Sequence, residues 1–112
     1  MEERIPRKPY IVSSEFNESR KRIYEYSLCE FGYFQAELYR QKIRTSLDTL
    51  HDGYLAFPEC RYLTTKSRMY RNIILDAHLI IYRITDERIE VLDIIHAASK
   101  IKTIRFIRKI RL

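Results

Sequence analysis

The C-terminal half of the chain combines cations with one histidine in a pattern that could act on a phosphodiester. His96 closes a run of apolar residues, and Glu90 lies six residues before it. Metal-free cleavage of RNA needs a base for the 2′-hydroxyl proton, an acid for the leaving oxygen and cations beside the phosphate. We identify His96 and Glu90 as candidates for proton transfer and Arg71 as a candidate for charge stabilisation.

Each of these candidates also has a structural interpretation. His96 could be a strand-end histidine bonded to backbone groups, and Arg71 could pair with Glu90 or Asp93 across a sheet. Because side chains alternate between the two faces of a strand, we expect Glu90 and His96 on the same face. Three further cations are candidates for contacting a target or nucleic acid, namely Lys66, Arg68 and Arg83.

The excess positive charge is concentrated at the C-terminus. The chain has 21 Lys and Arg against 15 Asp and Glu, a net charge of +6, and no acid follows Asp93. A basic end of this kind is typical of contact with nucleic acid or an acidic protein, or it is simply a solvated end that aids solubility. The candidate contacts in this tail are Lys102, Arg105, Arg108 and Lys109.

Length and composition favour one globular domain over residues 1–112, with a core at 10–98 and a basic tail at 99–112. No segment approaches the roughly 20 apolar residues of a membrane span, and the charged start lacks the apolar part of a secretory signal. We therefore expect a cytoplasmic protein with no membrane partner. Cys29 and Cys60 match no metal or redox spacing, so we expect neither a metal nor a cofactor.

The N-terminal half predicts a strand followed by two helices. A short strand is expected at 10–13, and a serine can cap a helix that runs to about residue 31, where Gly32 stops it. A second helix is expected at 33–51, and the short connection makes the pair an antiparallel hairpin. Apolar residues at steps of three and four form its buried stripe. These are Ala36, Tyr39, Ile43, Leu47 and Leu50.

The C-terminal half predicts three strands, at about 67–75, 78–85 and 89–96. The gaps between them are so short that they can join only antiparallel neighbours. A terminal helix is expected at about 99–110, with apolar residues on one arc and cations opposite. The fold class is therefore α+β, in the order β-α-α-β-β-β with a short C-terminal helix and an antiparallel sheet against a helical hairpin.

Two sets of residues, in this order and spacing, carry a family resemblance. The hairpin set is Tyr26, Gly32, Ala36, Leu47, Leu50 and Pro58. The sheet set is Tyr70-Arg71, residues 79–84, residues 89–92 and His96. Over residues 10 to about 98, the chain resembles the RelE/ParE superfamily of bacterial toxins from type II toxin–antitoxin systems. The resemblance implies a small cytosolic growth inhibitor that a cognate antitoxin neutralises.

The resemblance leaves the target open, and with it the question of whether the protein is an enzyme. RelE-like members cut messenger RNA in the ribosomal A site, whereas ParE-like members inhibit DNA gyrase. Ala97-Ala98 follows His96, where many RelE-like nucleases have an aromatic residue. We therefore favour a ParE-like inhibitor of DNA gyrase, with a ribosome-dependent mRNA endoribonuclease as the alternative. A module that binds nucleic acid through its tail is a third hypothesis.

Overall fold

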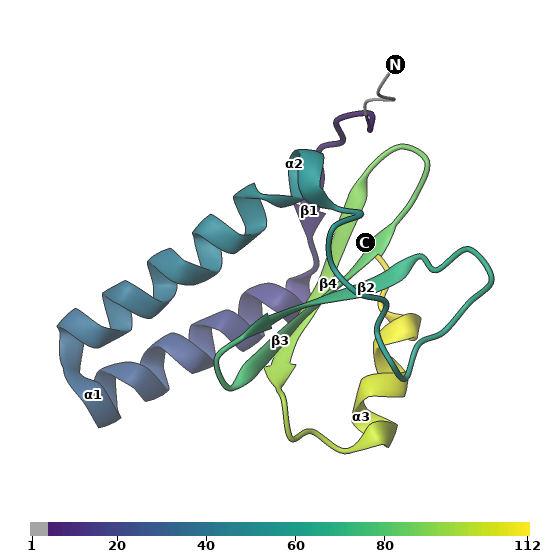
Figure 1. Cartoon of the computed structure of the whole chain (residues 1–112). Helices are drawn as coiled ribbons and strands as arrows, with labels where there is room; N and C mark the ends of the chain where they lie inside the picture. The colour runs from purple at the N-terminus through teal and green to yellow at the C-terminus, as the bar shows by residue number, and fades with distance from the viewer. Residues whose placement is uncertain (1–4) are drawn as a thin grey trace.

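The computed structural model describes residues 5–112 and contains the predicted elements in the predicted order (Figure 1). Residues 1–4, the start of the segment searched for a secretory signal, lie outside the described residues. No helix in the described part is long and apolar enough to cross a membrane. The elements are β1 (Tyr10–Val12), α1 (Ser14–Asp48), α2 (Leu50–Gly53), β2 (Tyr70–Leu75), β3 (His78–Ile84), β4 (Ile89–His96), α3 (Ile101–Phe106) and the 3₁₀-helix η1 (Ile107–Lys109).

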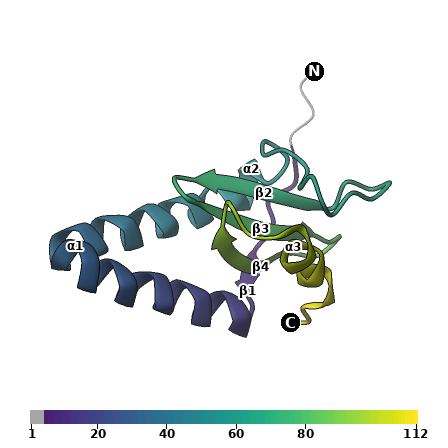
Figure 2. The same cartoon turned by 90° about the horizontal axis from the view of Figure 1, so that it is seen from below.

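Helix α1 is the predicted hairpin, because its backbone breaks at Gly32. This glycine has φ +85° and ψ 173°, a conformation that costs a side-chain-bearing residue far more than glycine. Ser13 caps the first arm, since its hydroxyl oxygen accepts a hydrogen bond from the amide of Phe16 at 2.9 Å. The two views show both arms projecting well beyond the sheet, with the folded end of the hairpin far from the strands (Figures 1 and 2).

The sheet has the order β1-β4-β3-β2. Strands β2, β3 and β4 are antiparallel, which confirms the arrangement expected from their short connections. Strand β1 adds a parallel edge strand, with Tyr10 opposite Ile89 and Val12 opposite Val91. This parallel pair is possible because the whole hairpin and two further strands connect β1 to β4.

A β-bulge interrupts the pairing of β3 with β4. Val91 pairs with Tyr82 and Asp93 pairs with Ile81, so Leu92 is an extra residue on β4. A bulge of this kind inverts the alternation of side chains beyond it. Our expectation that residues 90 and 96 share a face is therefore wrong, because the extra residue lies between them.

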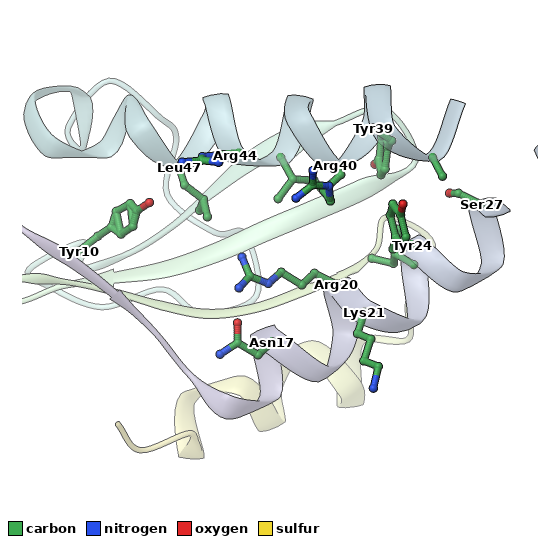
Figure 3. A pocket seen from close by; sticks show the side chains of 13 residues that line it. Tyr10, Asn17, Arg20, Lys21, Tyr24, Ser27, Tyr39, Arg40, Arg44 and Leu47 are labelled. Carbon is green, nitrogen blue, oxygen red and sulfur yellow. The ribbon is translucent and has the colours of Figure 1, made fainter. Parts of the chain in front are cut away.

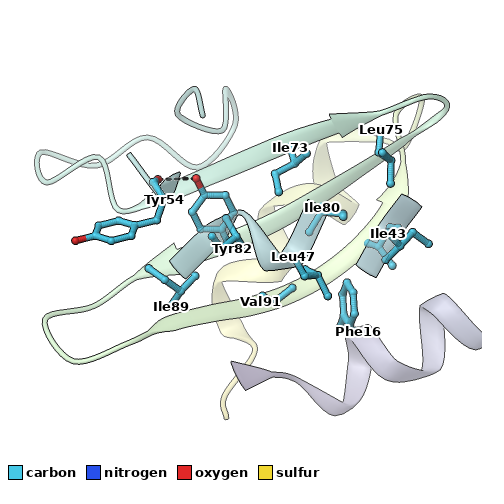
Figure 4. Close-up of a cluster of buried hydrophobic side chains, with 12 residues drawn as sticks. Phe16, Ile43, Leu47, Tyr54, Ile73, Leu75, Ile80, Tyr82, Ile89 and Val91 are labelled. Atoms are coloured by element: carbon cyan, nitrogen blue, oxygen red, sulfur yellow. Dashed lines mark hydrogen bonds between the residues drawn. The ribbon is translucent and has the colours of Figure 1, made fainter. Parts of the chain in front are cut away.

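Two apolar cores cover the two faces of the sheet. The hairpin-side core contains the predicted helical stripe, with Ile43, Leu47 and Leu50 buried against β2, β3 and β4 (Figure 4). In the same core the buried hydroxyl of Tyr82 donates to the carbonyl oxygen of Tyr54 at 2.7 Å. On the other face, α3 and η1 form a second core that includes Cys60, Leu63, Ile81, Leu92, Ile104 and Ile107.

Candidate functional site

Arg71 anchors a loop instead of lining an open site. It lies on β2, and its Nη1 donates to the carbonyl oxygens of Leu55 at 3.1 Å and Phe57 at 2.9 Å. Its Nε donates to the carbonyl oxygen of Arg68 at 3.2 Å. These bonds fasten the irregular segment 54–69 to the sheet. The expected pairing of this arginine with a carboxylate across the sheet is not found.

Glu90 is held in two ion pairs on the face that α3 covers. Arg83 Nε lies 2.7 Å from one carboxylate oxygen and Arg88 Nη2 lies 2.8 Å from the other. Burial raises the pKa of Glu90, but the hydrogen bonds from the two arginines outweigh it, and the net pKa is lowered. Arg83 also donates to the carbonyl oxygen of Ile110 at 3.2 Å. This carboxylate therefore stays ionised, and both of its oxygens are paired with arginines. Arg83 also links the C-terminal segment to the sheet.

His96 lies at the exposed end of β4, and its contacts match the structural interpretation. The backbone amide of Ala98 donates to its Nδ1 at 3.0 Å. Directly opposite on β3 is His78, whose ring centroid is 5.7 Å away with the planes at 73°. The structure therefore places a second imidazole beside that of His96.

The contacts of His78 favour one of its tautomers. Its Nδ1 lies 2.7 Å from the hydroxyl oxygen of Tyr39, and that hydroxyl donates to the carbonyl oxygen of Leu75 at 3.0 Å. Tyr39 has one proton to give and Leu75 can only accept, so both contacts are hydrogen bonds together only when His78 donates from Nδ1. The Nε2 atom of its neutral ring is then left as an acceptor. Burial lowers the pKa of His78, and the charge of His96 lowers it further.

These histidines open onto a groove between the hairpin and the end of the sheet. Asp93 lies in the same groove, where burial raises the pKa of its carboxyl although Ser19 and the charge of Arg22 oppose the shift. The aromatic side chains of Tyr26 and Phe31 are 62% and 64% exposed on its helical wall. Other residues lining the groove include Ile23, Gln35, Tyr39, Asp76, Ile94, Ile95, Ser99 and Thr103.

The fold does not bring together the three residues proposed for catalysis. Arg71 pairs with Tyr82 near the end of β3, whereas His96 pairs with His78 at its start, so the two lie toward opposite ends of the sheet. Glu90 is on the other face, beyond the bulge. The groove instead holds the imidazole pair together with Arg22, Asp76 and Asp93 as its ionisable side chains.

The remaining predicted contact residues are presented to solvent, except for the arginine on β3. Lys66 and Arg68 are exposed in the loop before β2, with Arg68 Nε 3.9 Å from a carboxylate oxygen of Glu59. The tail cations Lys102, Arg105, Arg108 and Lys109 are all exposed on α3 and η1.

A second hollow lies between the two arms of α1 and is rich in cations (Figure 3). Arg20 and Arg44 come from opposite arms toward this gap. Arg40 is already paired with Glu37 at 2.9 Å, and Glu37 also accepts from the hydroxyl of Tyr24 at 2.6 Å. Sequence reasoning missed this hollow, because it treated the arms of the hairpin only as packing surfaces.

Sequence reasoning also missed the role of His78. The position of His78 at the start of a strand, beside a turn, predicts a solvated side chain, yet the ring is half-buried against Tyr39. A regular antiparallel ladder that starts with Ile84 opposite Ile89 would place His78 opposite Ile95. The extra residue at position 92 moves His78 opposite His96, so the strand bounds alone do not predict this pairing.

The fold is that of a small α+β protein with a groove between a helical hairpin and a mixed four-stranded sheet. The chain belongs to the ParE toxin family: the family model described as "ParE toxin of type II toxin-antitoxin system, parDE" matches residues 10–101. A search of curated protein sequences finds no significant match.

A solved structure supports the same fold. A chain described as "Chromosomal ParDE TA system from P. aeruginosa" superposes with a TM-score of 0.68 at 15% sequence identity. The similarity covers 82% of the present chain and 98% of the other. At this identity the likeness establishes the arrangement of helices and strands, which agrees with the fold class expected from the sequence.

Proposed function

We propose that this protein is a growth inhibitor that acts on DNA gyrase by binding, in the cytoplasm, and that a cognate antitoxin neutralises it. The observation that carries the proposal is the separation of the candidate catalytic residues in a chain of the ParE family. The guanidinium of Arg71 donates hydrogen bonds to backbone carbonyl oxygens, and Glu90 forms ion pairs with two arginines. A toxin that works by occupying its target needs no acid–base set, so these residues are free to stabilise the fold.

Purified protein added to a gyrase supercoiling assay tests this proposal. The wild-type chain and a His96→Gln variant are both expected to inhibit supercoiling of relaxed plasmid, because neither requires proton transfer at this imidazole. A gyrase that stays fully active at concentrations that arrest growth would overturn the proposal.

The groove supports the antitoxin part of the proposal. Tyr26 and Phe31 expose large apolar surfaces next to it, and an amphipathic segment of a partner can bury such surfaces. Co-expression with the product of the neighbouring gene should raise the yield of soluble toxin strongly over expression of the chain alone. A Phe31→Ser change should weaken that complex, while Leu55→Ser, a similar change at an exposed apolar residue outside the groove, should not. Equal yields with and without the neighbour would contradict the proposal.

One observation favours the ribosome-dependent endoribonuclease as a second candidate. His78 and His96 lie side by side in a groove that also contains Arg22, so an acceptor imidazole, a second imidazole and a cation share one surface. Primer extension on cellular messages after induction separates the two functions. Codon-phased cleavage that His78→Gln or His96→Gln abolishes would establish the nuclease, and its absence during growth arrest would exclude it.

A further inference from the structure

The outer face of α3 and η1 exposes apolar side chains among a dense set of cations. Phe106 is 53% exposed and Ile101 is 45% exposed. The sequence pattern places Ile104, Phe106, Ile107 and Ile110 on one apolar arc. Ile104 and Ile107 are buried and Ile110 is partly buried, whereas Phe106 is exposed. An exposed aromatic ring is not explained by packing in this position, which raises the question of what it contacts.

The charge on this face is uncompensated. Residues 99–112 contain six cations and no acid, and within the described part of the chain none of the six forms a salt bridge. Lys102, Arg105 and Lys109 follow the spacing i, i+3, i+7, which places them along one side of a helix. They border a shallow depression whose apolar part is Ile101 and Phe106. The ammonium of Lys109 lies 4.6 Å from the centre of the Phe106 ring.

This segment is held in place, so the exposed ring cannot turn inward without breaking the second core. Ile104 and Ile107 are almost completely buried with Leu92 and Ile81. The carbonyl oxygen of Ile110 accepts a hydrogen bond from Arg83, which is itself fixed by its ion pair with a carboxylate. The cations and the aromatic ring are therefore presented together by a supported helix.

We propose that this face binds single-stranded nucleic acid. Lys102, Arg105 and Lys109 contact successive phosphates, and an unpaired base stacks on Phe106. A positively charged surface combined with an exposed aromatic ring is the arrangement that binds single strands without sequence preference. A duplex offers the same phosphates, but its bases are stacked on one another and cannot cover the ring. This surface is distinct from the groove, and its function does not depend on inhibition of gyrase.

Fluorescence anisotropy with a labelled 12-nucleotide oligo-dT, without gyrase or ribosomes, tests the proposal. The same label is placed on a 12-base-pair duplex and on a polyglutamate peptide. The Phe106→Ala variant should bind the oligonucleotide about 5- to 160-fold more weakly, because stacking contributes about 1–3 kcal/mol per base. Both control ligands should bind the wild type more weakly than oligo-dT does. Because the variant keeps the net charge of the wild type, its affinity for each control ligand should equal that of the wild type. Circular dichroism checks that the exposed change leaves the fold intact.

A charge variant tests the phosphate contacts separately. Replacing Lys102, Arg105 and Lys109 by Gln should flatten the dependence of log K on log salt for oligo-dT by about 2, since each contact to a single strand contributes about 0.7. A matched control replaces Lys21, Lys42 and Arg44 by Gln, which removes the same charge from exposed positions on the hairpin. The control should leave the salt dependence close to that of the wild type.

Three results would overturn the proposal. The first is an unchanged affinity of Phe106→Ala for oligo-dT, which would show that no base stacks on this ring. The second is tighter binding to the duplex than to the single strand. The third is polyglutamate bound as tightly as oligo-dT, which would identify an acidic protein segment as the occupant of this face.

Discussion

Leu92 and Ile94 are two residues apart on the same strand, yet they belong to cores on opposite faces of the sheet. In a regular strand such residues share a face, and the bulge between Val91 and Asp93 separates them. Because of the extra residue, β4 contributes a side chain to the second core under α3, and its last residues still line the groove. This single extra residue therefore decides which face of the sheet the last side chains of β4 occupy, and so which groups they can contact.

Leu92 should be among the most costly positions to truncate. It is fully buried in the core that supports α3, so Leu92→Ala should lower the free energy of unfolding by about 2–5 kcal/mol. Ile74→Ala, on the exposed side of β2, is the control and should change it by less than about 0.5 kcal/mol. Urea denaturation measures both. Equal small effects would mean that α3 does not pack on the sheet as described.

Arg71 should behave as a structural residue. Arg71→Lys keeps the charge but loses the planar fork that reaches two loop carbonyls, so the free energy of unfolding should fall by about 1–3 kcal/mol. Growth inhibition, corrected for the folded fraction, should be unchanged. A variant of normal stability that has lost its toxicity would show instead that this guanidinium acts on a target.

Glu90 should make stability depend on pH in the acid range. Its pKa in the folded protein is below its ordinary value of 4.5, so its stabilisation is present above about pH 4.5 and is lost as the pH falls through the folded pKa. Glu90→Gln should lower the free energy of unfolding at pH 6 by up to about 3 kcal/mol, because it leaves Arg83 without a charged partner. The difference from wild type should shrink at pH 3. Urea titrations at both pH values measure it, and a difference that grows toward pH 3 would contradict the assignment.

His78 should titrate below its ordinary pKa of 6.5, because burial and the nearby charge of His96 both disfavour its protonated form. NMR titration of the imidazole signals measures this directly. His96→Gln should move the pKa of His78 back toward 6.5. By linkage, protonation of His78 costs stability as the pH falls through 6.5. An unshifted pKa in the wild type would mean that His78 is not half-buried beside His96 in solution.

Local sequence patterns determined which elements form. Apolar steps of three and four predicted the second arm of the hairpin, and the structure buries four residues of that stripe and partly buries Tyr39. Gly32 was placed correctly as the break, because a reversal of this kind favours a residue without a side chain. Gaps of two and four residues made the three strands antiparallel. These are short-range effects, and each is written in a window of a few residues.

The tertiary structure alone decided which face each residue of β4 occupies and which partners the charged groups find. A regular strand would place Glu90 and His96 on the same face. The extra residue at position 92 inverts this alternation, and no local sequence pattern predicts it. Arg71 found backbone carbonyls of a distant loop, while Arg83 found Glu90. Phe106 stayed exposed although its apolar character predicted burial. Burial and pairing depend on segments far apart in the chain, so they are settled only when the sheet, the hairpin and the last helix pack together.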